Sequence, residues 1–107
     1  MPLYMMQGSY TTEALVRFCK NPDDRGKALE KLISAMGGEI ISLYYSMGQD
    51  DFVFITDMPD DMTAMSTLLA GIAPGHIKEY RTSKLFTLEQ SKDFMRQAGQ
   101  VLAATSG

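Results

Sequence analysis

The chain has little of what several common classes of protein depend on. Its 107 residues include one cysteine, Cys19, so no disulfide can form within the chain, which fits a reducing cytosol. No apolar run approaches the roughly 20 residues that a membrane-spanning helix needs. No charged segment leads into an apolar one at the N-terminus, as it would in a secretory signal. We therefore expect a cytoplasmic protein that does not engage a membrane.

Basic charge and histidine are also scarce. Ten Lys and Arg residues stand against thirteen Asp and Glu residues, which gives a net charge of −3. Nucleic-acid binding needs a surplus of positive charge on one face, so we expect no nucleic-acid partner. The single histidine, His76, has no histidine partner and no Cys or Glu at metal-ligand spacing. We therefore expect no metal and no cofactor.

The pattern that organises the chain is a β-hairpin between Gly37 and Pro59. Two runs rich in Ile, Tyr, Phe and Val flank a polar break at 48–51. With Gln49-Asp50 as a two-residue loop, Met47 would pair with Phe52 and Tyr45 with Phe54. One face would then hold Ile41, Leu43, Tyr45, Met47, Phe52 and Phe54, and the other Ser42, Tyr44, Ser46, Val53, Ile55 and Asp57.

The first third of the chain is expected to form a strand followed by two helical pieces. Residues 2–10 are strand-like, and Thr11 and Thr12 can cap the start of a helix. Cys19 lies on the apolar side of this first piece and is expected to be a small buried side chain. Asn21-Pro22 interrupts the helix, and Asp23-Asp24 would lie near the positive end of a second one. Gly37 is expected to end that second helix in a left-handed conformation.

The remaining chain predicts a helix, a strand and a final helix. Pro59-Asp60-Asp61 is typical of a helix start, residues 76–86 are strand-like, and Thr87 and Gln90 form a capping box. The final helix should run over about 88–103. The helix after Pro59 is expected to bury one apolar stripe against the hairpin, made of Met62, Met65, Leu68, Leu69 and Ile72.

This order of elements predicts one domain over residues 1–107 of the α+β class. It is the βαββαβ order of the ferredoxin-like fold, a four-stranded antiparallel sheet with two helices on one face, followed by an extra C-terminal helix. The two helices leave the other face of the sheet uncovered, roughly 350–400 Å² in plan. We expect a second copy of the chain to cover that face, giving a homodimer or a higher homo-oligomer.

A series of short motifs resembles the GYD domain family. They are Tyr10-Thr11, Arg25, Gly37-Gly38, Gly48-x-x-Asp51 and Asp57-x-Pro59-Asp60. The resemblance implies a ferredoxin-like protomer in a dimeric α/β-barrel, and it implies no particular activity. Asp50 stands where the family usually has a tyrosine. We interpret Gly48 and Asp51 as a structural turn motif.

Several polar and aromatic side chains are candidates for binding a flat or acidic small molecule. We expect the site to be a cleft between the sheet and a partner subunit, with Arg81 holding a carboxylate. Two alternatives stay open: a cofactor-independent monooxygenase or isomerase of the same fold, and a purely structural or interaction module. Whether the protein is an enzyme is therefore undecided. The candidate ligand-binding residues are Tyr4, Tyr44, Asp57, His76, Tyr80 and Arg81.

Overall fold

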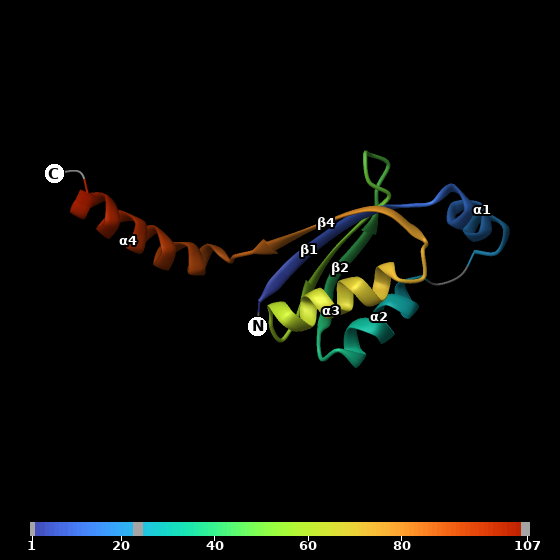
Figure 1. Cartoon of the computed structure of the whole chain (residues 1–107), viewed down its shortest axis with the longest axis horizontal. Helices are drawn as coiled ribbons and strands as arrows, with labels where there is room; N and C mark the ends of the chain where they lie inside the picture. The colour runs from blue at the N-terminus through green and yellow to red at the C-terminus, as the bar shows by residue number, and fades with distance from the viewer. Residues whose placement is uncertain (1, 23–24, 106–107) are drawn as a thin grey trace.

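A computed structural model describes residues 2–22 and 25–105. It confirms the α+β class and the expected order of elements (Figure 1). The four strands form one antiparallel sheet in the order β2-β3-β1-β4. Within the described residues, no helix is both long and apolar enough to cross a membrane. The elements are β1 (Leu3–Tyr10), α1 (Thr12–Lys20), α2 (Arg25–Ala35), β2 (Glu39–Tyr45), β3 (Phe52–Asp57), α3 (Asp61–Ile72), β4 (Ile77–Leu85) and α4 (Leu88–Thr105).

Local signals place the ends of the first two helices as expected. The backbone N–H of Ala14 donates to Thr11 Oγ1 over 3.1 Å, and α1 ends at Lys20, just before Asn21-Pro22. Gly37 closes α2 with a φ of 81°, in the left-handed region that favours glycine. The expected role of Asp23 and Asp24 at the start of α2 lies outside the described residues.

The hairpin forms, but its predicted loop and pairing are wrong. Tyr45 pairs with Phe52 and Leu43 with Phe54, so the loop spans residues 46–51 rather than two residues. The last residue of the loop extends the pairing of β3 with β1, since the Asp51 N–H donates to the Gly8 carbonyl over 2.8 Å. The new pairing differs from the predicted one by two residues, so Leu43, Tyr45, Phe52 and Phe54 still share a face.

A bulge in β2 changes the rest of that face. The register shifts between Ile40 and Ser42, so Ile40 joins the core while Ile41 stays exposed. The prediction that Ile41 and Met47 share a strand face with Leu43 is therefore wrong, since Ile41 is the extra residue of the bulge and Met47 lies fully exposed in the loop. The hydroxyl of Thr56 stabilises the strand next to the bulge by donating a hydrogen bond to the Glu39 carbonyl over 2.9 Å.

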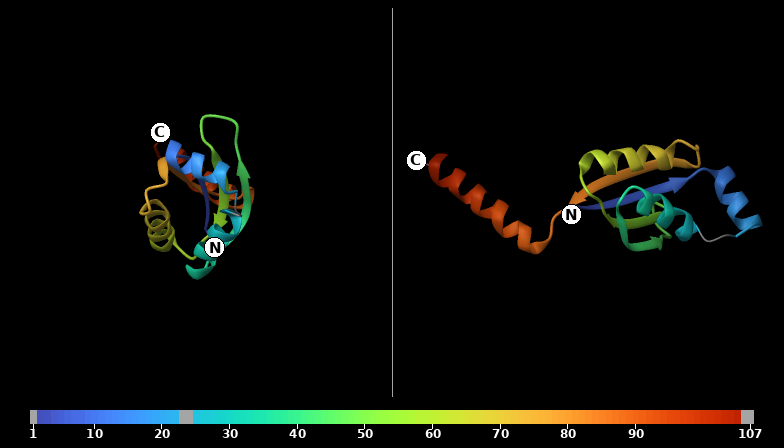
Figure 2. Two further views of the ribbon diagram at one scale, coloured as in Figure 1. Left: turned by 90° about the vertical axis from the view of Figure 1, so that its right-hand side faces the viewer. Right: turned by 90° about the horizontal axis from the view of Figure 1, so that it is seen from below.

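Helices α2 and α3 cover one face of the sheet and enclose the core (Figure 2). We call the opposite side the open face, since no described helix covers it. The strand register places Leu3, Met5, Gln7, Ser42, Tyr44, Val53, Ile55, Arg81 and Leu85 there. The buried core on the helix side consists of Tyr4, Met6, Ile33, Phe52, Phe54, Met58 and Ala64.

The predicted buried stripe of α3 is only partly right, because Leu68 packs against the core but the buried side of the helix is rotated from the predicted one. Met62, Met65 and Leu69 are exposed, while Ala64 and Thr67 are buried. Contacts at the N-terminus of α3 set this rotation. The Thr63 N–H donates to the Asp60 carboxylate, and Asp61 accepts from the Tyr4 hydroxyl and pairs with Lys84. These contacts tie the first turn to β1 and β4 and turn the methionines outward.

The last helix, α4, projects away from the rest of the molecule (Figure 1). Its capping box is confirmed, since the Thr87 N–H donates to Gln90 Oε1 over 2.8 Å and the Gln90 N–H to Thr87 Oγ1 over 3.0 Å. None of its residues from Leu88 to Thr105 is buried. At the other end of the molecule Cys19 is exposed, contrary to our expectation, because α1 packs only part of its apolar side.

Candidate functional site

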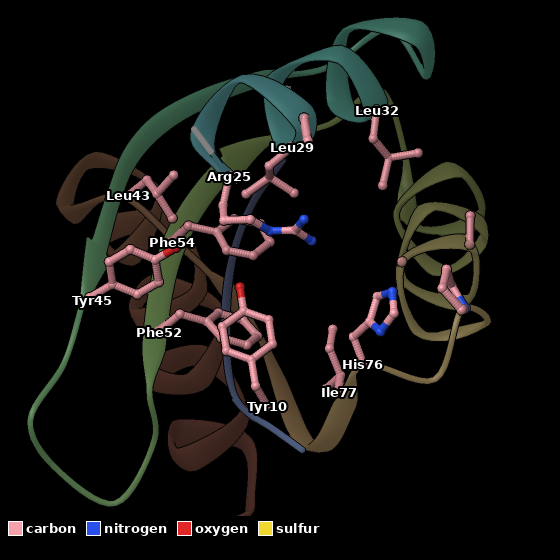
Figure 3. Close-up of a pocket in the computed structure, with 14 residues that line it drawn as sticks. Tyr10, Arg25, Leu29, Leu32, Leu43, Tyr45, Phe52, Phe54, His76 and Ile77 are labelled. Atoms are coloured by element: carbon pink, nitrogen blue, oxygen red, sulfur yellow. The ribbon is translucent and has the colours of Figure 1, made fainter. Parts of the chain in front are cut away.

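A partly enclosed hollow lies between the sheet and its two covering helices (Figure 3). Its volume is about 230 Å³. A second, more open hollow of about 380 Å³ adjoins it, because Tyr10, Arg25 and Tyr45 line both. We call the first hollow the pocket. It is lined by Tyr10, Arg25, Ala28, Leu29, Leu32, Leu43, Tyr45, Phe52, Phe54, Ala70, Gly71, Pro74, His76 and Ile77.

The walls of the pocket are largely apolar. Strands β2 and β3 contribute an aromatic floor, in which the rings of Phe52 and Phe54 lie 6.1 Å apart with nearly parallel planes. The Tyr10 ring lies 5.1 Å from that of Phe52 and extends the floor toward β4. Four side chains bring polar groups to these walls: Tyr10, Arg25, Tyr45 and His76. The arrangement is typical of small-molecule sites, in which a few polar groups orient an apolar ligand.

Tyr10 and Arg25 form the best-defined polar pair. Burial raises the pKa of the Tyr10 hydroxyl, the neighbouring Tyr45 raises it further, and a hydrogen bond with Arg25 acts in the opposite direction. The hydroxyl therefore keeps its proton at neutral pH. The Arg25 guanidinium also lies over the Phe18 ring, 4.5 Å from its centroid, which holds the charge at the edge of the pocket.

His76 lies across the pocket from the hairpin strands, at the start of β4 (Figure 3). Its Nδ1 is 2.9 Å from an Arg17 guanidinium nitrogen. The same guanidinium nitrogen is 3.4 Å from Nε2, and because arginine only donates, the imidazole is the acceptor in this contact. Among the described residues, no three His, Cys, Asp or Glu side chains gather in a way that would hold a metal ion.

The structure does not bring the six predicted ligand-binding residues together. His76 lines the pocket, whereas Tyr44, Asp57 and Arg81 belong to strand positions on the open face. Tyr4 is buried beneath α3, and Tyr80 is half-exposed on the edge strand β4. The reason is strand alternation, because residues of odd and even position point to opposite faces of one sheet.

Tyr10, Arg25 and the aromatic floor were not among the predicted site residues. Two signals for them were present: Tyr45, Phe52 and Phe54 fall on one predicted face, and Tyr10 and Arg25 belong to the family-like motifs. Nothing in the sequence indicated that α2 would carry Arg25 over this face, since that depends on how the helix packs.

The hairpin loop binds β1 and β4 instead of forming a tight turn. The Asp51 carboxylate accepts from the Tyr10 backbone N–H over 2.9 Å, and so fixes the end of β1 beside the pocket. The Asp50 carboxylate is about one-tenth exposed and forms an ion pair with Arg81. Gly48 does not have a positive φ, so its predicted turn role does not rest on left-handed geometry. Asp50, at the family's usual tyrosine position, thus ties the loop to β4.

Tyr4 provides a prediction about alkaline pH. Burial and the hydrogen bond to Asp61 raise its pKa from 10.0 to about 12, so folding favours the protonated hydroxyl. This contribution to stability is present below pH 10 and is lost as pH rises through about 12. In a spectrophotometric titration of tyrosinate, we expect Tyr4→Phe to remove one ionisation from the top of the curve. Loss of an ionisation near pH 10 instead would contradict this environment for Tyr4.

Comparison with known proteins supports the fold and the family-like motifs. The family model described as GYD domain matches residues 4–95. No curated protein matches the sequence. The crystal structure of MtbAldR is 13% identical with a TM-score of 0.59, and the match covers 80% of this chain and 53% of that one. The chain therefore spans about half the length of MtbAldR.

A second solved structure is similar over nearly its whole length. TTHA0845 from Thermus thermophilus is 16% identical with a TM-score of 0.53, and the match covers 81% of this chain and 95% of that one. At such low identity, both likenesses show a shared fold and carry no function with them.

Proposed function

Since the chain belongs to the GYD domain family, whose fold alone selects no activity, we propose that it is a small-molecule-binding protein whose site is the pocket. The observation that carries the proposal is an apolar, aromatic-floored hollow into which a guanidinium, an imidazole and two phenol groups converge. A purely structural module would be expected to fill this space with side chains, as ordinary protein cores do.

The volume of the pocket limits the size of the ligand. An engineered cavity of about 150 Å³ accepts benzene, so 230 Å³ corresponds to about nine or ten non-hydrogen atoms. That is one aromatic ring with a short substituent. The floor of Phe52, Phe54 and Tyr10 favours a planar molecule, because aromatic rings stack on or meet the edges of other rings.

The polar groups determine the charge of the ligand. Arg25 is always protonated, and the Tyr10 hydroxyl stays protonated at neutral pH, so both are hydrogen-bond donors. Among the described residues that line the pocket, none is an Asp or Glu. A carboxylate or phenolate is therefore the substituent that these donors match best. We propose a ligand of the aromatic-acid class, about the size of salicylate.

The position of the pocket places the ligand away from the expected interface between subunits. Our sequence analysis expected a cleft between the sheet and a partner subunit, but the pocket lies on the helix side of the sheet. We retain the homodimer as a proposal, with the second copy on the open face. Ligand binding then needs no residue from the partner. We also propose a cytoplasmic location, in which the exposed thiol of Cys19 stays reduced.

The binding proposal can be tested with salicylate and a pair of adjacent tyrosines. Tyr45 lines the pocket and Tyr44 belongs to the open face, and both side chains are about two-thirds exposed. We expect Arg25→Gln to weaken salicylate binding about tenfold or more, because a charge-assisted hydrogen bond is worth about 1.5–3 kcal/mol. We expect Tyr45→Phe to weaken binding severalfold and Tyr44→Phe to leave it unchanged. Titration calorimetry measures all three.

Two outcomes would contradict the proposal. One is that salicylate, benzoate and phenol all fail to bind the wild-type protein at millimolar concentration. The other is that Tyr44→Phe weakens binding as much as Tyr45→Phe does, which would put the ligand on the open face. Thermal unfolding of each variant shows whether a lost affinity reflects a lost fold.

A further inference from the structure

Helix α4 carries an apolar stripe that the rest of the described chain leaves largely exposed. Leu88, Met95 and Leu102 recur at intervals of seven residues, with Phe94 and Val101 beside two of them. Such spacing places the five side chains on one side of the helix. They are between 45% and 87% exposed. Most of the stability of a helix in a protein comes from packing of its apolar side, so this stripe calls for a partner surface.

The surface area of the chain indicates how large that partner surface is. The accessible surface is 7574 Å², whereas a compact monomer of 11.9 kDa exposes about 6,000 Å². The radius of gyration is 17.5 Å, against about 13 Å for a compact domain of this length. The excess of about 1,600 Å² is twice the roughly 800 Å² that each partner buries in a standard stable complex.

The charges on α4 argue against a lipid or nucleic-acid partner. Glu89 pairs with Lys92 over 3.3 Å and Asp93 with Arg96 over 3.1 Å, so the charges cancel along the helix itself. A helix that lies on an anionic membrane or tracks a phosphate backbone usually carries a surplus of Lys and Arg on its polar side. What α4 offers to a partner is therefore its apolar stripe.

The stripe is continuous with the open face of the sheet. Leu85 ends β4 opposite Leu3, so both belong to the open face. Phe86 follows, and its ring meets that of Phe94 on α4 edge to face at 5.6 Å. A second copy that covers the open face would thus reach the start of α4 without a break in apolar contact. The same chain also supplies further apolar surface for the stripe, in the exposed side chains of Met62, Met65 and Leu69 on α3.

We propose that α4 is a dimerisation arm, which lies against a second copy of this chain and buries its apolar stripe there. Two-fold symmetry makes the exchange reciprocal, so each copy both gives and receives an arm. The inference concerns assembly and does not depend on a ligand in the pocket.

Two double-lysine variants of α4 test the proposed arm. Met95→Lys with Leu102→Lys changes the stripe, and Gln97→Lys with Gln100→Lys adds the same charge away from it. We expect the stripe variant to raise the dissociation constant of the dimer roughly hundredfold, because its lysines would bury charge in an apolar contact. The control variant should dimerise as the wild type does. Sedimentation equilibrium measures both, and circular dichroism checks the fold.

A second measurement identifies the chain that receives the arm. Heavy-isotope and natural-abundance protein are mixed and treated with an amine cross-linker, and cross-links from Lys92 are assigned by mass spectrometry. Links between a heavy and a light chain support the arm, and Lys92→Arg removes them. Two results would overturn the proposed arm. One is a wild-type protein that is monomeric at micromolar concentration, and the other is equal dimerisation of the two lysine variants. Salicylate binding by the stripe variant separates this failure from failure of the pocket proposal.

Discussion

Gly8→Ala is expected to destabilise the fold by about 1–3 kcal/mol, the usual cost of overpacking a core. A Cβ at this position would lie 2.6 Å from the Glu79 carbonyl oxygen and 2.7 Å from the Phe52 ring. The carbonyl belongs to the backbone of β4, which pairs with β1 along its length, so it cannot yield without loss of strand pairing. The residue that can move is Phe52, which lines the pocket.

The Gly8 variant therefore also affects the proposed site. If Phe52 turns away from the new methyl group, it enters the pocket and reduces the volume open to a ligand. We expect weaker salicylate binding together with lower stability, measured by calorimetry and by chemical denaturation. Gly99→Ala is the matched control, because a Cβ there meets nothing within 4 Å and alanine favours a helix by about 0.5–1 kcal/mol. A Gly8→Ala protein as stable as the wild type would contradict the close approach of these strands.

Ile33→Ala is expected to destabilise the fold by about 2–5 kcal/mol, as is usual for a large truncation in a core. Ile33 is 1% exposed and is the one described residue of α2 that is fully buried. It joins the core cluster that includes Met58, and its carbonyl accepts the Gly38 N–H at the end of the helix over 2.9 Å. Truncating its side chain weakens the packing of α2 against the sheet.

Loosening α2 should also impair the pocket, since this helix supplies Arg25, Ala28, Leu29 and Leu32 to its lining. We expect the Ile33 variant to bind salicylate less well even where it remains folded. Val16→Ala serves as the control, because Val16 is about half-exposed on α1 and lines no part of the pocket. Chemical denaturation should show a change of less than about 1 kcal/mol for the control. A similarly small change for Ile33→Ala would mean that α2 is held by other contacts.

The predicted hairpin shows where reasoning from sequence stops. The two strands were evident from their β-branched and aromatic residues, and Tyr45, Phe52 and Phe54 were correctly predicted to share one face. The loop was wrong by four residues, because the Asp51 carboxylate binds the Tyr10 N–H on a strand 41 residues away. A contact between residues so far apart leaves no trace in the local pattern.

The candidate site shows the same limit. Tyrosines and Arg81 were grouped as site residues because their chemistry suits a ligand, but strand alternation separates them onto two faces. Arg25 was part of a motif, yet its place at the pocket depends on the path of α2 across the sheet. The pocket therefore emerges only when the end of β1, the hairpin, helices α2 and α3 and the start of β4 are brought together.

The sequence by itself determined the order and class of the elements, the helix caps at Thr11, Asp60 and Thr87, and the left-handed end of α2 at Gly37. These features depend on interactions within a few residues, which a local pattern records. Only the tertiary structure decided the rotation of α3, the reach of the hairpin loop and the location of the pocket. Each of these rests on a bond between distant residues, such as Tyr4 with Asp61 or Asp50 with Arg81, and such bonds form only once the chain has folded.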